Sequence, residues 1–174
     1  GDIDKLIISE RSDPGKFLEN KTTMAFIQKK YSLSQYMVFQ SPDAAQWYSG
    51  RISVNGKVIF NPVKPDLPTP YTHIRQKKIV NFCRISPEKN LIMLVSAFAL
   101  LHREYPDYKL YIYGNPGNGS SDDYYRSLQQ HIAQSGCSTH IHLFPARNDI
   151  HEVIRDYAMF VSSSDYEGMS NSML

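Results

Sequence analysis

The chain ends in a stretch whose residue types could hold a hydroxyl-rich ligand. Apolar residues from Ala158 to Val161 precede three serines, Glu167 and Gly168, which is the order of a strand, a loop and a helix start. Small side chains let a ligand approach the backbone, and the amides that open a helix attract an anion. A carboxylate is a poor neighbour for phosphate, so Glu167 is expected to bind hydroxyl groups, such as those of a sugar.

Arg84 and Lys89 form a second candidate pair, suited to a diphosphate. Arg84 closes an apolar strand pattern, and Lys89 falls in the first turn of a predicted helix that Ser86 caps and Pro87 opens. Two cations at the positive end of a helix dipole lower stability unless an anion lies between them. A diphosphate would satisfy both, through the arginine fork and the lysine point charge. The alternative is a surface pair with Glu88.

A glycine-rich loop, Gly114–Gly119, connects a predicted strand to a predicted helix. Its outer glycines have the spacing of a P-loop, but Ser120 stands where a P-loop needs lysine. The loop also lacks the G-x-G-x-x-G pattern of dinucleotide sites. A plain turn is therefore expected here.

Metal-binding patterns are weak in this sequence. His140 and His142 lie two apart, on one face of a predicted strand, but a metal site would need a third ligand and none is evident. Asp122 and Asp123 stand at a predicted helix start, where acidic side chains complement the helix dipole. No metal site is predicted.

Residues 167–174, E-G-M-S-N-S-M-L, resemble the donor-site motif of the family 4 glycosyltransferases, retaining enzymes of the two-domain GT-B architecture. That motif is a glutamate, seven residues and a second glutamate; Glu167 fits the first, and the second would fall one position beyond Leu174. The spacing of Arg84 and Lys89 is similar to the family's phosphate-binding pair. The segments Ser9–Pro14 and Val38–Val63 resemble the end of the acceptor-side domain and the hinge.

The resemblance implies a role for each candidate residue. Glu167 would position the donor sugar without acting as a nucleophile, and Arg84 and Lys89 would bind the leaving diphosphate. Phe144 and Arg147 could flank the nucleotide base, although a proline-bent loop explains the same residues. The other residues implied to contact the donor are Gly168, Met169, Ser170, Asn171 and Gly114.

The implied activity is transfer of a hexose from a UDP- or GDP-sugar to a glycan or lipid-linked acceptor, with retention, without cofactor or metal. Cell-surface or capsular polysaccharide synthesis in a bacterium is the implied setting. The expectation for the 174 residues alone is weak donor binding and no transfer. Two alternatives stay open: another nucleotide-sugar protein, such as an epimerase or a glycogen-type synthase, and a non-catalytic donor-binding domain.

The elements that must position these residues alternate between strand and helix, which predicts a doubly wound, Rossmann-like parallel α/β sheet. The prolines at 62, 65, 68 and 70 predict a hinge over 61–75, between the tail of an acceptor-side α/β domain (1–60) and a nucleotide-sugar domain (76–174). The tail has too few elements for a self-contained sheet. Strands are predicted over Lys5–Glu10, Tyr36–Gln40, Lys57–Phe60, Lys78–Cys83, Lys109–Tyr113, His140–Phe144 and Met159–Val161, and helices over Asn20–Tyr31, Ser41–Tyr48, Ser86–Tyr105, Asp122–Ser135 and Asp149–Tyr157.

Composition and charge limit the classes of partner that this chain is expected to bind. The net charge is +2, but residues 1–80 carry 12 Lys and Arg against 7 Asp and Glu. Such a basic half suits an anionic membrane surface or simply a solvated face, and no basic run interleaved with aromatics predicts nucleic-acid binding. Apolar runs are too short to span a membrane and no signal peptide is evident. With Cys83 expected as a buried free thiol, the cytoplasm is predicted, with peripheral membrane contact.

Overall fold

The computed structural model describes residues 6–17, 21–53, 55–117 and 120–172. The chain divides into two compact units, Pro65–Asp165 and a unit that combines Gly1–Lys64 with Tyr166–Leu174. The sequence analysis placed the C-terminal segment in the second domain, whereas the structure groups it with the first unit.

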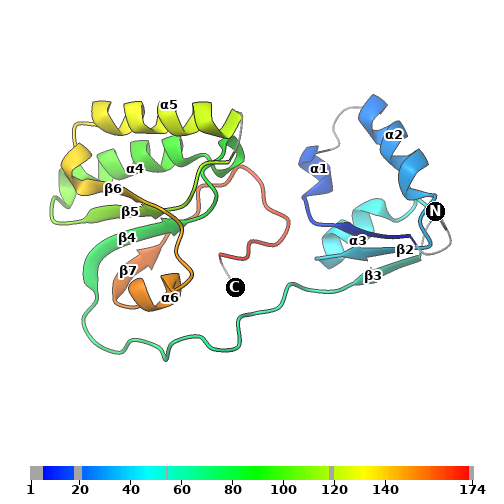
Figure 1. Cartoon of the computed structure of the whole chain (residues 1–174), viewed down its shortest axis with the longest axis horizontal. Coiled ribbons are helices and arrows are strands. Elements are labelled where there is room, and N and C mark those ends of the chain that lie inside the picture. Colours follow the sequence, from blue (N-terminus) through cyan, green and yellow to red (C-terminus); the bar gives the residue numbers. More distant parts are fainter. Residues whose placement is uncertain (1–5, 18–20, 54, 118–119, 173–174) are drawn as a thin grey trace. The chain divides into compact units, whose positions relative to one another are not determined.

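The second unit is a parallel four-stranded sheet with helices on both faces (Figure 1). Its strand order is β6-β5-β4-β7, so the chain moves outward from β4 on one side and then crosses to β7 on the other. The strands are β4 (Gln76–Phe82), β5 (Lys109–Tyr113), β6 (Ile141–Phe144) and β7 (Tyr157–Phe160). In such open sheets, ligands bind outside the carboxyl ends of the strands near the point where the order reverses.

Two long helices, α4 (Leu91–Glu104) and α5 (Ser120–Gln134), cover one face of this sheet, and the short α6 (Ile150–Val153) lies on the other (Figure 1). Residues of α4 recur at helical spacing and are buried against β4 and β5, as the apolar stripe predicts. Members of this core include Leu91, Leu94, Val95, Phe98, Ile79, Leu110 and Ile112.

The predicted helix Ser86–Tyr105 is wrong at its start. A 3-10 turn, η2 (Pro87–Lys89), is followed by Asn90 in the left-handed conformation (φ 44°), and only then does α4 begin. Asn90 caps α4 by accepting the Met93 amide (3.3 Å), whereas the Ser86 hydroxyl donates to Glu88 (2.6 Å). Lys89 therefore ends a separate turn and does not lie in the first turn of α4.

The helix predicted over 149–157 is also too long. It is one turn, α6, because Tyr157 already belongs to β7 and is buried (6% exposed) in the core on that face. A second 3-10 turn, η3 (Ser138–His140), precedes β6. The predicted strand Lys109–Tyr113 is confirmed to the residue as β5.

The first unit contains a parallel three-stranded sheet in the order β1-β2-β3, so the expectation of too few elements for a sheet is wrong. Its helices are α1 (Pro14–Phe17), α2 (Lys21–Tyr31) and α3 (Pro42–Tyr48), and its strands are β1 (Ile7–Glu10), β2 (Tyr36–Phe39) and β3 (Asn55–Val58). Met37 and Phe39 from β2 pack with Tyr48 and Ile52 in a separate small core. Ser41, where the sequence predicts this helix to begin, caps α3 by accepting the Ala44 amide (3.2 Å).

An Asn-Gly pair is typical of a turn, but Asn55 and Gly56 lie within β3 and pair with β2, so this strand begins two residues before the predicted Lys57. A Cβ on Gly56 would lie 2.6 Å from the Phe39 ring, so glycine here makes room for that ring. Residues 61–75 hold no helix or strand, as their prolines predict.

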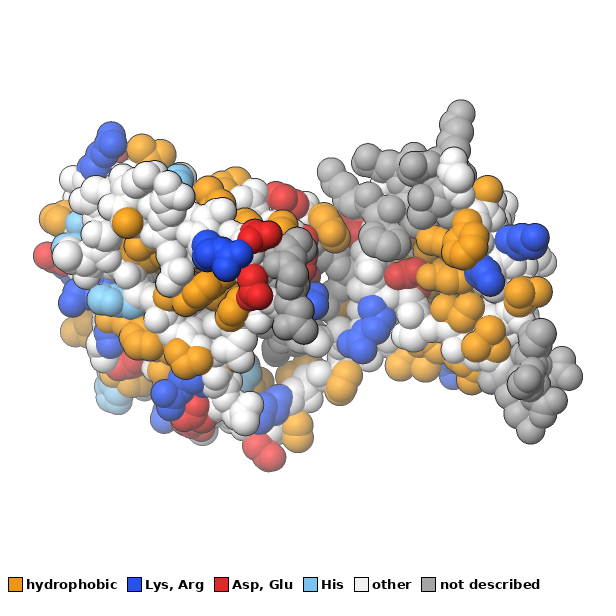
Figure 2. All heavy atoms as spheres, turned by 45° about the horizontal axis from the view of Figure 1, so that its top comes forward, with side chains coloured by type: hydrophobic (Ala, Val, Ile, Leu, Met, Phe, Trp, Pro, Cys, Tyr) orange, Lys and Arg blue, Asp and Glu red, His pale blue; other side chains and the backbone are white. Residues whose placement is uncertain are grey.

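Figure 2 shows how charged side chains are distributed on one face of the molecule. On the face shown in Figure 2, Lys and Arg side chains are scattered among acidic, polar and apolar ones. Across the described part of the chain, no helix combines the length and apolar character that a membrane crossing requires.

Candidate functional site

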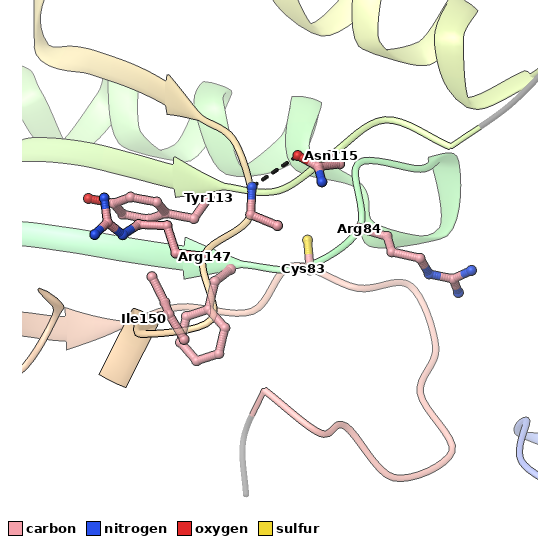
Figure 3. A pocket seen from close by; sticks show the side chains of 8 residues that line it. Cys83, Arg84, Tyr113, Asn115, Arg147 and Ile150 are labelled. Carbon is pink, nitrogen blue, oxygen red and sulfur yellow. Dashed lines mark hydrogen bonds between the residues drawn. The ribbon is translucent and has the colours of Figure 1, made fainter. Parts of the chain in front are cut away.

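The second unit has a cavity of about 290 Å³ where β4, β5 and β6 end (Figure 3). This is the edge of a parallel sheet at which α/β folds bind ligands. The lining residues are Phe82, Cys83, Arg84, Tyr113, Asn115, Ala146, Arg147 and Ile150.

Backbone contacts fix the three strand ends that form this cavity. The Cys83 amide donates to the Tyr113 carbonyl (3.1 Å), and the Gly114 amide donates to the Phe144 carbonyl (2.9 Å). The side chain of Asn115 accepts the Ala146 amide (3.0 Å), which ties the loop after β5 to the loop after β6. Sequence reasoning missed Asn115, although its place directly after a strand and a glycine was a usable signal.

Gly114 lies where two chain segments meet. A Cβ at this position would lie 2.1 Å from the Cys83 carbonyl oxygen and 3.1 Å from Ile85, so only glycine fits. Residues 114–117 form a loop in which Pro116 pairs with Ile85 in an isolated bridge, and residues 118–119 of the glycine-rich loop lie outside the described residues, so the turn expected here stays a prediction.

Arg84 stands on the opposite side of the cavity from Arg147, and its guanidinium points away from the other labelled side chains (Figure 3). Its side chain is 80% exposed and lies 3.6 Å from a Glu88 carboxylate oxygen. The surface pair with Glu88 is therefore the arrangement of this structure. An exposed ion pair of this kind contributes little to stability, so the guanidinium can exchange its partner for a ligand at small cost.

The neighbouring Glu88 is held in its charged form. Partial burial raises the pKa of its carboxyl, but the Ser86 hydrogen bond, its own backbone amide, Arg84 and Lys89 together outweigh burial, and the pKa is lowered. Glu88 thus keeps a negative charge beside Arg84 at neutral pH. A bound anion would have to replace it.

Lys89 lies at the end of the η2 turn, which is tied to the loop that follows β7. The Ser163 hydroxyl donates to the Lys89 carbonyl (2.8 Å), and the Asp165 amide donates to the Glu88 carbonyl (2.9 Å). The turn after β4 and the loop after β7 are therefore joined where the strand order of the sheet reverses.

Phe144 and Arg147 both lie at the end of β6, but only Arg147 lines the cavity. Arg147 donates twice to Asp149 (2.8 and 2.7 Å), which raises the pKa of its guanidinium. Phe144 is 40% exposed and stacks on Tyr113 (centroids 5.2 Å apart), which is itself a lining residue. Contact of either residue with a nucleotide base stays a prediction.

His140 and His142 pack against aromatic rings, with centroids 4.2 Å from His102 and 4.9 Å from Tyr111, respectively. Burial first, and then the charges of Lys109 and His140, lower the pKa of His142. His140 contacts the Thr139 hydroxyl (3.0 Å). Among the residues that the structure describes, no group of three or more His, Cys, Asp or Glu could hold a metal ion.

Glu167 and Gly168 line a different cavity, of about 220 Å³, within the first unit. A Cβ on Gly168 would lie 2.4 Å from the Arg11 carbonyl oxygen, so the loop carrying Glu167 packs tightly on the turn after β1. The remaining lining residues are Ser12, Asp13, Pro14, Ser41, Asp43, Ala44 and Trp47. The predicted residues thus form two groups, one in each unit.

The helix start predicted after Gly168 is absent from the described residues, because 166–172 form bends and turns. Asn61 holds this segment: its side chain donates to the Met169 carbonyl (3.3 Å) and to Asn171 Oδ1 (2.6 Å). The Ser170 hydroxyl contacts that of Ser172 (2.9 Å). Within the described residues, these amides are therefore held by loop contacts rather than by a helix start.

Glu10 fixes the turn beneath the Glu167 loop. It is 8% exposed, and its Oε1 accepts the amides of Arg11 (2.9 Å) and Ser12 (3.0 Å). Its Oε2 accepts the hydroxyls of Tyr31 (3.2 Å) and Tyr48 (2.8 Å). Burial, followed by the charge and hydrogen bond of Glu10, raises the pKa of Tyr31 to about 12. Sequence reasoning missed this role, for which a glutamate closing an apolar strand was the only signal.

Comparison with known proteins matches the chain to one family. The family model of Glycosyl transferases group 1 matches residues 71–174. No curated protein matches the chain significantly.

Solved structures share the fold over nearly the whole chain. A mutant of S. aureus TarM, in complex with Fondaparinux, alpha-GlcNAc-glycerol and UDP, has a TM-score of 0.79 at 19% identity, covering 97% of this chain and 34% of its own. The pneumococcal O-GlcNAc transferase GtfA, in complex with UDP and GlcNAc, has a TM-score of 0.72 at 16% identity. The match covers 97% of this chain and 35% of the GtfA chain. Anabaena HepE, in complex with UDP and glucose, has a TM-score of 0.68 at 16% identity. The match covers 92% of this chain and 46% of the HepE chain.

These likenesses, together with the parallel sheets and their flanking helices, confirm the α/β Rossmann-like fold expected from the sequence. The chain spans between 34% and 46% of the length of the three solved chains described above.

Proposed function

The chain belongs to the group 1 glycosyl transferases, and we propose that it binds a nucleotide-diphosphate sugar and transfers the sugar, with retention, to an acceptor hydroxyl. In this reaction the acceptor oxygen bonds to the anomeric carbon and the bond from that carbon to phosphate breaks. The nucleoside diphosphate leaves with the electron pair, and the hydroxyl proton is released.

The observation that carries the proposal is the cavity at the carboxyl ends of β4, β5 and β6. It lies at the ligand-binding edge of the sheet, and Arg84 and Arg147 line it from opposite sides (Figure 3). A diphosphate needs cations nearby, and a nucleotide base needs an apolar wall to pack against. The apolar wall of this cavity consists of Phe82, Tyr113 and Ile150. A cavity of about 290 Å³ is near the small end of the range for nucleotide-sized ligands.

Arg84 and Lys89 would bind the diphosphate and stabilise the charge that develops as it leaves. Arg84 would exchange its contact with Glu88 for phosphate oxygens, which its forked guanidinium binds in pairs. Lys89 would add a point charge from the adjacent η2 turn. Fixed positive charges at a leaving group lower the barrier because they gain energy as that charge develops.

The remaining donor contacts follow the family motif. Glu167 would hold the sugar hydroxyls, which is a positioning role. Phe144 and Arg147 would flank the base, and Gly114 would let the donor approach the backbone. The amides and side chains of the motif loop would complete the site through Gly168, Met169, Ser170 and Asn171.

The proposed donor is a UDP-hexose, since the TarM, GtfA and HepE structures described above are each complexes with UDP. The proposed acceptor is a glycan or a lipid-linked glycan of a bacterial cell-surface or capsular polysaccharide, glycosylated in the cytoplasm at the inner face of the membrane. Because Arg84, Lys89 and Arg147 supply positive charge, we propose that diphosphate binding needs no metal ion.

Calorimetric titration of the 174-residue chain with UDP, GDP and ADP tests the proposal. We expect saturable binding of UDP with a Kd on the order of 0.1 mM, corresponding to about 5.5 kcal/mol, and weaker binding of the other two. The same isotherm in excess EDTA is expected if no metal takes part. Silence from all three nucleotides at millimolar concentration would contradict the proposal.

A further inference from the structure

We propose that Ser163 and Asp165, two residues of the loop after β7, are positioning residues for the donor diphosphate. Their side chains hold the η2 turn in the conformation from which Lys89 binds phosphate. The inference rests on the proposed function, which assigns the diphosphate to Arg84 and Lys89, and it adds two residues that act through the turn without touching the ligand. Both belong to the same unit as the turn.

Three consecutive residues of the chain at the turn, 88–90, are each bonded to this loop. The Asp165 amide donates to the Glu88 carbonyl (2.9 Å), and the Ser163 hydroxyl donates to the Lys89 carbonyl (2.8 Å). The Asn90 side chain donates from Nδ2 to Asp165 Oδ1 (2.7 Å), across 75 residues of sequence. The backbone at Lys89 and on both sides of it is therefore fixed by a distant segment.

The turn has little support of its own. It is a single 3-10 turn, closed by the Lys89 amide bond to the Ser86 carbonyl (3.0 Å) and the Asn90 amide bond to the Pro87 carbonyl (3.0 Å). Asn90 then adopts a left-handed conformation (φ 44°), which costs energy for a residue with a side chain. A turn this short keeps such a conformation only when neighbouring segments hold it.

The position of this backbone matters for phosphate binding. A lysine carries its charge on a long flexible stem, so the backbone conformation sets the region that its ammonium group can reach. A charge stabilises a leaving group best when it is in place before the reaction. Ser163 is buried (7% exposed), so its bond to the Lys89 carbonyl is shielded from competing water.

The charge of Asp165 and its hydrogen bond have opposite effects on phosphate affinity. A carboxylate bonded to this turn repels an anionic ligand, so a change that removes only the charge should leave UDP affinity equal or higher. A change that also removes the bond to Asn90 should lower UDP affinity if positioning outweighs charge. The sign of the change therefore separates the two effects.

Two double variants of the 174-residue chain lose the same charge and the same number of hydroxyl groups. Ser163→Ala with Asp165→Ala removes both side-chain bonds to the turn. Ser162→Ala with Asp165→Asn is the matched control, because Ser163 stays and asparagine retains an oxygen that accepts from Asn90. Ser162 is exposed, and its hydroxyl lies 3.4 Å from that of Ser164.

Calorimetric titration with UDP measures the consequence for the ligand. We expect the Kd of the Ser163→Ala, Asp165→Ala variant to be about tenfold higher than that of the parent chain, since two hydrogen bonds that hold the turn are lost. The control variant should bind UDP within about twofold of the parent chain, or more tightly because a negative charge is gone.

Amide hydrogen exchange without ligand measures the turn itself. The Lys89 and Asn90 amides should exchange about tenfold faster in the Ser163→Ala, Asp165→Ala variant and at the parent rate in the control, whereas the amides of β5 should be unchanged in both. Faster exchange in β5 as well would mean that the whole unit is destabilised, and Asp165→Ala alone then decides by the same two criteria.

Parent-like UDP affinity in the Ser163→Ala, Asp165→Ala variant, or parent-like exchange of its Lys89 and Asn90 amides, would overturn the inference. Equal weakening of UDP binding in the two double variants would also overturn it, because the control keeps both bonds. Failure of the parent chain to bind UDP would instead contradict the proposed function, and the exchange comparison would still decide whether the loop holds the turn.

Discussion

Replacing Arg84 and Lys89 together with alanine is expected to abolish detectable UDP binding, with an affinity loss of about 100-fold or more. Each charge-assisted contact to phosphate is worth roughly 1.5–3 kcal/mol, which is tenfold or more per contact. The Arg84 side chain is 80% exposed and lies 3.6 Å from a Glu88 carboxylate oxygen, so its removal should cost the fold little. The loss should therefore appear in affinity and not in the melting temperature.

The matched control is Arg103→Ala with Lys109→Ala, which removes the same two kinds of charge from the same unit. Arg103 lies in the last turn of α4, and Lys109 begins β5 at the end of the strand remote from the cavity. Calorimetry of both double variants separates a local contact from a general effect of net charge. Equal UDP affinity in the two double variants would contradict the assignment of Arg84 and Lys89.

Gly114→Ala is expected to lower the free energy of unfolding by about 3 kcal/mol, the upper part of the range for overpacking. The added methyl would lie 2.1 Å from the Cys83 carbonyl oxygen. Neither backbone can move freely, because the Cys83 amide bonds to Tyr113 and the Gly114 amide bonds to Phe144. Displacing them would separate the strand ends that form the cavity, so UDP binding should fall as well.

Gly50→Ala provides the control for backbone conformation. Gly50 has φ of 77° with nothing within 4 Å of an added Cβ, so only left-handed strain opposes alanine there. That strain costs roughly 1–2 kcal/mol. In urea denaturation, the free energy of unfolding of Gly114→Ala should be clearly lower than that of Gly50→Ala. Equal free energies would mean that the close contact at Gly114 relaxes without cost.

Features set by local sequence could be predicted. The β-branched and aromatic run Lys109–Tyr113 specified β5 to the residue, and Ser41 with Pro42 specified the start of α3. Both signals act within a few residues: strand propensity with buried alternation in one case, and a cap followed by proline in the other.

Features set by contacts between distant segments could not be predicted. An Asn-Gly pair is typical of a turn, yet Gly56 is a strand residue that leaves room for the ring of Phe39. Asn90 interrupts an apolar helical pattern because its side chain also bonds to Asp165 (2.7 Å), 75 residues further along the chain. Propensity alone contains no information about either partner.

The candidate sites show the same division. The spacing of Arg84 and Lys89 and the type of Glu167 pointed to ligand chemistry, but not to the separate cavities that Arg84 and Glu167 line. Asn115 was missed because its role depends on a segment from another part of its unit. Such a role becomes visible only when the strands are arranged in space.

Amide chemical-shift mapping of the 174-residue chain with UDP tests the central claim most directly, that a nucleoside diphosphate binds at the carboxyl ends of β4, β5 and β6. The account predicts saturable shifts concentrated at Cys83, Arg84, Asn115 and Arg147, which line the cavity, and their loss in the Arg84→Ala, Lys89→Ala double variant. Saturable shifts confined to other parts of the chain, or no shifts at millimolar UDP, would contradict it.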